Sequence, residues 1–195
     1  MPRSTSFTSE ELADRALQHF WANGFHASSM DDLVRATGVS RHGIYASFGG
    51  KKTLFLACFD RYQTAVVTPA FKVVEAPGAT LESVADYFER QISLGESMGL
   101  PGYGCFVANS ATEVAPDDPE VMEQVALHNS RLRRGFASNL QNTSPELDTQ
   151  QAIQLANVMV IFTNGLWTMS RSVSDGDELR QAVQNFLTLL TENLK

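Results

Sequence analysis

The chain has 195 residues, 43% of them hydrophobic and 19% charged, the composition of a globular protein with a buried core. Its two cysteines, Cys58 and Cys105, are too few for a disulfide framework, and the first residues lack the apolar stretch of a signal peptide. Since no uninterrupted apolar run reaches about 18 residues, we expect no membrane span and a cytoplasmic protein.

The formal net charge of −7 is unevenly distributed. Residues 1–62 carry seven Lys and Arg against six Asp and Glu, a net of +1, whereas residues 63–195 carry eight against sixteen, a net of −8. The acidic part is therefore excluded as a nucleic-acid surface. The nearly neutral first part would offer little non-specific attraction to phosphates.

The first predicted element is an amphipathic helix over residues 9–23. Thr8 followed by Glu11 is the sequence of a capping box, and Gly24 ends the helix. Its apolar stripe consists of Leu12, Ala16, Leu17, Phe20 and Trp21. We interpret this stripe as core.

Two short helices joined by a tight turn are predicted next. Ser28 or Ser29 caps the first of them, and Gly38 ends it because glycine tolerates the left-handed backbone of a sharp turn. Ser40 caps the second helix, residues 41–48, which is predicted to bury Ile44 and Phe48 and to leave another face open. This order is typical of a helix-turn-helix.

The stretch GFHASSMDDLVRATGVSRHGIYASFGGKKTLF, residues 24–55, resembles the DNA-binding segment of TetR-type transcriptional regulators. The resemblance rests on the turn Gly38-Val39-Ser40 and on Tyr45, Phe48 and Lys51 at their spacing. Thr37 stands where the family often has Ala. The resemblance implies an all-α fold of about nine helices, with a helix-turn-helix DNA-binding domain over residues 1–50 and an effector-binding and dimerisation domain over residues 51–195.

DNA contacts are predicted on and around the second short helix. Arg41 would bond a guanine edge or, equally, a phosphate, whereas His42 makes a base or phosphate contact or none. Gly43 would allow close approach to a base. Family resemblance implies that Tyr45 and Lys51 meet the DNA backbone. The hydroxyl residues near the same surface are Ser28, Ser29, Ser40 and Ser47.

Helices continue through the acidic part. One runs from Lys51 towards Val67, where Pro69 disturbs its end. Another is predicted to begin after its cap Thr80 and to end before the break at Gly99–Gly104. The others are predicted at 105–115, at 119 to about 140, capped by Asp118, at about 149–173 and at about 176–193. The helix over 149–173 is apolar on nearly all sides. We expect the last two helices to pair with those of a second, identical chain; the alternative is that they only close the monomer core.

No metal-ligand spacing and no phosphate-binding glycine loop occurs in the sequence, so we expect no cofactor and no metal. Family resemblance instead implies an apolar pocket for a small-molecule effector in the second domain. Residues with bulky or hydrogen-bonding side chains in its helices are the candidates for the lining: Tyr87, Phe88, Met98, Tyr103, Phe106, Asn109, Phe136, Phe162 and Trp167.

Cys105 follows a glycine-rich loop and opens a predicted helix, where a thiol's pKa falls. Some relatives sense electrophiles or oxidants through such a cysteine; the alternative is a buried, inert thiol. A hydrolase using Cys105 with His128 is a remote alternative, since no orienting acid is evident. The sequence thus predicts a non-enzymatic homodimeric repressor that leaves a pseudo-palindromic operator when an effector binds. An activator or an architectural DNA protein would share the same DNA-binding segment.

Overall fold

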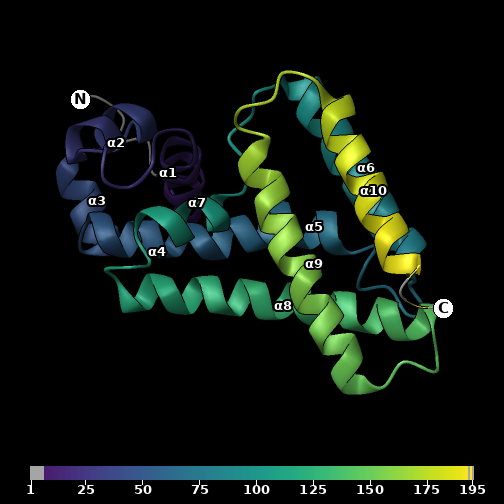
Figure 1. Ribbon diagram of the computed structural model, residues 1–195. Helices are drawn as coiled ribbons and strands as arrows, with labels where there is room; N and C mark the ends of the chain where they lie inside the picture. Colours follow the sequence, from purple (N-terminus) through teal and green to yellow (C-terminus); the bar gives the residue numbers. More distant parts are fainter. Residues whose placement is uncertain (1–6, 193, 195) are drawn as a thin grey trace. The chain divides into compact units, whose positions relative to one another are not determined.

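The computed structural model describes residues 7–192 and 194, and within these all regular structure is helical (Figure 1). The helices, in chain order, are α1 (Ser9–Asn23), α2 (Met30–Thr37), α3 (Arg41–Phe48), α4 (Lys51–Tyr62), the π-helical segment η1 (Gln63–Val67), α5 (Thr68–Phe71), α6 (Leu81–Met98), α7 (Phe106–Glu113), α8 (Pro119–Thr143), α9 (Thr149–Met169) and α10 (Gly176–Glu192). If α4, η1 and α5 are taken as one run, the described chain has the nine helices that the sequence predicted.

The chain forms two compact units. One extends to Val67 and also includes Asn109–Val125; the other comprises Thr68–Ala108 and the chain from Ala126 onward. These units do not divide the chain after residue 50, where the sequence predicts the end of the DNA-binding domain, because α4 packs into the core of the first unit. The ring of Phe55 on α4 lies 5.1 Å from Phe20 of α1 and 4.7 Å from Phe25 (centroid distances).

Polar contacts fix the ends and the crossing of α1 in the first unit. As predicted, Thr8 accepts the N–H of Glu11 at 3.1 Å, and the Glu11 carboxylate accepts the N–H of Thr8 at 3.0 Å. Arg61 on α4 donates to both carboxylate oxygens of Asp14 on α1, at 2.7 and 2.9 Å. This planar two-bond pairing is the strong form of an arginine–carboxylate contact. It ties α1 to α4 independently of the aromatic core.

Pro69 does not end the helix that begins at Lys51. The α-helical pattern of α4 gives way to the wider turns of η1 and then resumes in α5, which contains Pro69. Proline has no N–H to donate to the carbonyl four residues earlier, and a π-helical turn changes the hydrogen-bond register just before it. The chain thereby stays helical past the proline.

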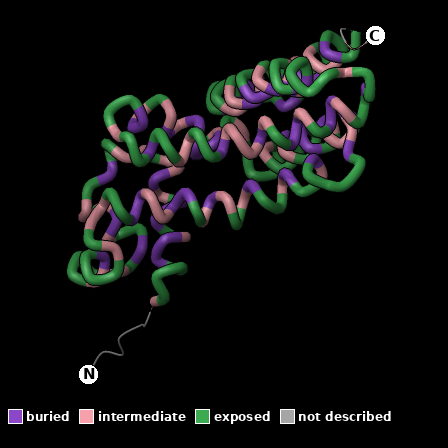
Figure 2. Tube along the Cα trace, turned by 90° about the horizontal axis from the view of Figure 1, so that it is seen from below, coloured by how far each residue is buried: buried purple, intermediate pink, exposed green. Residues whose placement is uncertain are grey.

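The second unit is built around aromatic contacts between helices. Phe71 lies 5.4 Å from both Tyr87 of α6 and Phe136 of α8 (centroid distances). Gly135 permits this approach, since a Cβ there would lie 2.6 Å from the Phe71 ring. Helices α6 and α10 run side by side (Figure 1), and Figure 2 shows buried and exposed residues alternating along the helices, as expected for amphipathic segments.

Helix α9 is capped by Asp148 and ends at Met169, four residues before the predicted end. By length and composition it could cross a membrane, with a mean hydropathy of 1.2 over 18 residues. Its polar residues, however, pair with α8: Asn164 donates to Asn129 at 3.0 Å, and Asn157 accepts from Arg133. We therefore assign α9 to packing within a helical bundle. The predicted end of the last helix, residue 193, lies outside the described residues.

Candidate nucleic-acid interface

The two helices of the helix-turn-helix are each held by a side-chain cap. Ser29, not Ser28, caps α2: its hydroxyl accepts the N–H of Asp32 at 3.2 Å, and the Asp32 carboxylate accepts the N–H of Ser29 at 2.8 Å. The hydrogen bonds from Ser29 hold the pKa of Asp32 below its usual value. Ser40 caps α3 by accepting the N–H of Gly43 at 3.1 Å. Both N-termini are thus fixed by local contacts.

The turn between the helices is fixed to α1. Gly38 has the left-handed φ of 72° that its sequence position predicted, and its N–H donates to Val34 at 2.9 Å. Thr37 is buried; its hydroxyl donates to the carbonyl of Leu33 at 2.7 Å, and its own carbonyl accepts from Arg15 of α1 at 2.9 Å. The Thr found where the family often has Ala therefore serves as a hydrogen-bonding residue of the turn. Sequence reasoning missed this role of Arg15.

Helix α3 buries one face and exposes another. Ile44 is fully buried as predicted, whereas Phe48, also predicted to be buried, is only partly so. The exposed residues are Arg41, His42, Tyr45, Ala46 and Ser47. Ala46, one turn beyond His42, was not among the predicted contacts, although helical periodicity alone would have found it. Gly43 leaves room for Val39, whose Cγ1 would lie 2.7 Å from an added Cβ. The close packing of Val39 therefore explains why a glycine occurs at position 43, independently of any approach to a base.

Arg41 reaches across to α2. Its guanidinium donates to the carboxylate of Asp31 at 2.8 Å, and both side chains are more than half exposed. Exposed pairs of this kind contribute only about 0–1 kcal/mol. Exchanging Asp31 for a DNA acceptor would therefore cost the protein little.

Two predicted contacts face inward and need correction. Ser28 is 1% exposed, and its hydroxyl donates to the carbonyl of Gly24 at 2.5 Å, so it offers DNA no hydroxyl. The Lys51 ammonium donates to the carbonyls of Phe25 and Ser28, both at 2.7 Å, and lies 4.2 Å from the centre of the Phe25 ring. Burial lowers the pKa of Lys51. The ammonium of Lys51 therefore stabilises the turn between α1 and α2 and is not directed outward at a DNA phosphate.

The predicted effector residues are only partly brought together. Tyr87, Phe88, Phe106 and Phe136 are buried in the second unit, where Trp167 lies 6.4 Å from Tyr87 and 6.1 Å from Phe88, and Phe162 lies 6.0 Å from Phe88 (centroid distances). Burial raises the pKa of the Tyr87 hydroxyl. Asn109 belongs to the first unit.

Met98 and Tyr103 contradict the prediction, because they are 76% and 53% exposed. Met98 is the last residue of α6, and Tyr103 lies in the glycine-rich loop between α6 and α7. A groove of about 710 Å³ lies elsewhere, between α6 and α10, and shares none of the predicted lining residues; its charged residues include Asp86, Glu89 and Arg180.

Cys105 and His128, the pair considered for thiol chemistry, are both buried, each 5% exposed. The cysteine directly precedes α7. Burial, and then the charge of Arg131, lowers the pKa of His128 to about 4. The imidazole is therefore neutral at physiological pH.

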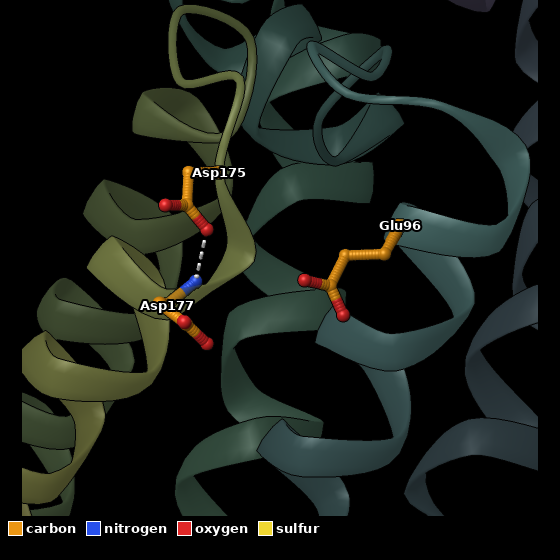
Figure 3. A group of neighbouring side chains, drawn as sticks. All are labelled: Glu96, Asp175 and Asp177. Carbon is orange, nitrogen blue, oxygen red and sulfur yellow. Dashed lines mark hydrogen bonds between the residues drawn. The ribbon is translucent and has the colours of Figure 1, made fainter.

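Three exposed carboxylates at the junction of α6 and α10 lie close enough together to hold a metal ion: Glu96, Asp175 and Asp177 (Figure 3). Asp175 accepts the N–H of Asp177 at 2.9 Å. Arg180 donates to Glu96 at 2.6 and 2.9 Å and to Asp177 at 3.1 Å. Because the guanidinium already occupies the carboxylates of Glu96 and Asp177, we assign no metal to the cluster.

Comparison with known proteins places the helix-turn-helix in a family. Residues 12–58 match the family model described as "Bacterial regulatory proteins, tetR family". The HTH-type transcriptional repressor ComR of Escherichia coli (strain K12) is 26% identical over 200 residues, 99% of this chain and 93% of that protein. An uncharacterised HTH-type regulator of Bacillus subtilis (strain 168), YezE, is 24% identical over 97% of this chain and 100% of its own length.

Solved structures share the fold over nearly the whole chain. The TetR family transcriptional regulator CifR, in a complex with 26-bp double-strand operator DNA, superposes with a TM-score of 0.79 at 21% identity, covering 96% of this chain and 98% of that one. The predicted all-α fold, with an N-terminal helix-turn-helix followed by a helical C-terminal part, is thereby confirmed.

Proposed function

Because the chain belongs to the TetR-type family of transcriptional regulators, we propose that it is a cytoplasmic, homodimeric repressor that binds a pseudo-palindromic operator and leaves it when a small-molecule effector binds. The observation that carries the proposal is the capped α3, which presents Arg41, His42, Tyr45, Ala46 and Ser47 on one exposed face. A recognition helix with this presentation fits the major groove. The protein acts by binding, without a catalytic step.

Each exposed residue of α3 receives a role that its chemistry allows. Arg41 reads a guanine or holds a phosphate, and His42 donates to a base edge or phosphate. The methyl group of Ala46 suits the thymine methyl. Tyr45 and Ser47 contribute hydroxyls to the sugar-phosphate chain. Ser29 and Ser40 remain at the rim, their hydroxyls occupied by the helix caps.

The dimer interface in this proposal is one stripe of α9. The exposed residues Gln154, Val158, Ile161, Gly165 and Thr168 recur at spacings of three and four. Ile161 is 72% exposed, and a Cβ at Gly165 would meet nothing within 4 Å. An apolar stripe with a glycine permits close crossing of two identical helices. Leu189 on α10 is a second exposed aliphatic residue in the helices that we assign to the interface.

The effector site in this proposal is the aromatic cluster of Tyr87, Phe88, Phe162 and Trp167. An effector reverses DNA binding only by binding the non-binding arrangement more tightly than the DNA-binding one. The cluster is apolar apart from the Tyr87 hydroxyl and the Trp167 indole, which hydrogen-bond to each other, so it favours a small, largely apolar effector. Ligand-induced quenching of Trp167 fluorescence, measured together with release from the operator, tests this placement.

The operator test uses DNA duplexes selected by the purified protein from a random library, followed by footprinting. We expect symmetric half-sites about one helical turn apart. Arg41→Ala should weaken binding by about 1–3 kcal/mol and relax the preference at one base pair if Arg41 reads a guanine. If it contacts a phosphate, the affinity for all DNA sequences should fall by the same factor, and the slope of log affinity against log salt concentration should decrease by about 1. Arg35→Ala on α2, which removes an equal charge, is the control.

An unchanged footprint and affinity for Arg41→Ala would remove Arg41 from the interface. Failure to select any symmetric sequence would contradict the proposed function itself. A reporter gene behind the selected operator distinguishes repression from activation.

A further inference from the structure

The turn between α1 and α2 is held from outside its own sequence by the last residue of α7. One carboxylate oxygen of Glu113 accepts the N–H of Phe25 at 3.1 Å, and the other accepts the N–H of His26 at 2.7 Å. These residues are 88 and 87 positions apart in the chain, yet lie in the same compact unit. Two consecutive amides directed at one carboxylate form a charge-assisted pair, stronger than two neutral hydrogen bonds.

The carbonyl groups of the same turn are held by Lys51. Its ammonium donates to Phe25 and Ser28, both at 2.7 Å, and the charge of Glu113 favours the protonated form against the effect of burial. The turn is therefore fixed through its N–H groups by an anion and through its C=O groups by a cation. Neither partner belongs to α1 or α2.

Gly24 fits this arrangement in two ways. Its φ of +84° is rarely adopted by residues with a side chain, and an added Cβ would lie 2.8 Å from both carboxylate oxygens of Glu113. The carboxylate thus occupies the space that a side chain at residue 24 would take. The segment Gly24-Phe25-His26 thus binds the carboxylate of Glu113 at the end of α7.

We propose that Glu113 is a positioning residue for DNA recognition: it fixes the turn from which α2 starts, and so sets the orientation in which α2 and α3 meet the operator. The inference rests on the proposed function. The core of the first unit does not depend on Glu113, because Phe20, Phe55 and the Arg61–Asp14 pair hold α1 against α4. Loss of the carboxylate therefore changes the presentation of the helices more than it changes folding.

Electrostatics and positioning predict opposite outcomes when Glu113 is removed. Deleting a negative charge from the first compact unit strengthens attraction to any DNA. Loss of positioning weakens binding to the operator alone. The ratio of operator to non-specific affinity therefore separates the two effects.

The experiment measures Glu113→Ala, Glu113→Asp and Asp117→Ala against the selected operator duplex and a scrambled duplex of equal length, at one salt concentration. Glu113→Asp keeps the charge and shortens the reach, and Asp117→Ala removes an equal charge from an exposed residue of the adjacent turn. We expect both Glu113 variants to lose roughly tenfold in operator affinity with undiminished affinity for scrambled DNA. Asp117→Ala should keep the wild-type ratio.

Amide hydrogen exchange of the peptide spanning residues 24–28 is the second readout and needs no DNA. We expect faster exchange at Phe25 and His26 in Glu113→Ala, with a thermal midpoint close to that of Asp117→Ala. If Glu113→Ala fails to fold, Glu113→Asp carries both measurements.

Unchanged exchange, or faster exchange with an unchanged affinity ratio, would overturn the positioning role. A wild-type protein that binds operator and scrambled DNA equally would refute the proposed function, while the exchange data would still report on the contact itself.

Discussion

Replacing Ile161 by aspartate should separate the dimer. Complete burial of an isoleucine side chain is worth about 1.5–3 kcal/mol. Since 72% of Ile161 is exposed in the single chain, a partner can still cover most of it, which is worth about 1–2 kcal/mol per copy. Two-fold symmetry doubles the effect to about 2–4 kcal/mol, or roughly 30- to 700-fold in the dimer dissociation constant. Two facing carboxylates add a further desolvation penalty.

Sedimentation equilibrium or mass photometry over nanomolar to micromolar concentrations measures this shift. Leu94→Asp is the matched control, because Leu94 is also an exposed aliphatic residue, 51% exposed, but belongs to α6 and not to α9. We expect the control to remain dimeric and Ile161→Asp to become monomeric with unchanged helical content. If Ile161→Asp stays dimeric at nanomolar concentration, the α9 stripe is not the interface.

Two further changes test the titratable side chains of Lys51 and His128. Lys51→Met keeps the aliphatic stem but removes both hydrogen bonds to the turn, and should lower the free energy of unfolding by about 1–3 kcal/mol in urea denaturation, whereas Lys52→Met should have a smaller effect. For His128, the folded pKa of about 4 lies below the value of 6.5 of an unperturbed imidazole, so between these values the unfolded chain binds a proton that the folded chain does not. Stability therefore falls as pH drops through this window, by about 2 kcal/mol at about pH 5, and His128→Gln should lose that part of the pH dependence; equal slopes in both proteins would contradict the assignment.

Local features of the fold were readable from the sequence because their determinants are close in the chain. Thr8, Ser40 and Gly38 each act within three or four residues, as a cap or a turn residue, and each takes the predicted role. The helix boundaries follow from the same short-range rules. The π-helical segment before Pro69 was not predicted. A proline in the sequence shows which backbone hydrogen bond is lost, but it does not show how the neighbouring helical turns adjust.

Site residues were less predictable because exposure depends on distant partners. Nothing around Ser28 distinguishes it from Ser29, yet one hydroxyl is buried against Gly24 and the other caps α2. The direction of Lys51 is set by carbonyls 23 and 26 residues away. Glu113 is separated from its partners by most of the first half of the chain, and no local pattern marks it.

The charges around α2 and α3 indicate where specificity comes from. Arg35 pairs with Asp32 and Arg41 with Asp31, while Lys52 binds the carboxylates of Asp118 and Glu120 and Lys51 faces inward. Each of these four cations is thus already bound to an acceptor within the protein. The carboxylates beside Arg35, Arg41 and Lys52 cancel most of the local positive charge, which leaves little net attraction to phosphates in general. Discrimination must then come chiefly from base edges met by α3, so operator affinity should vary with salt less steeply than that of a strongly basic DNA-binding domain.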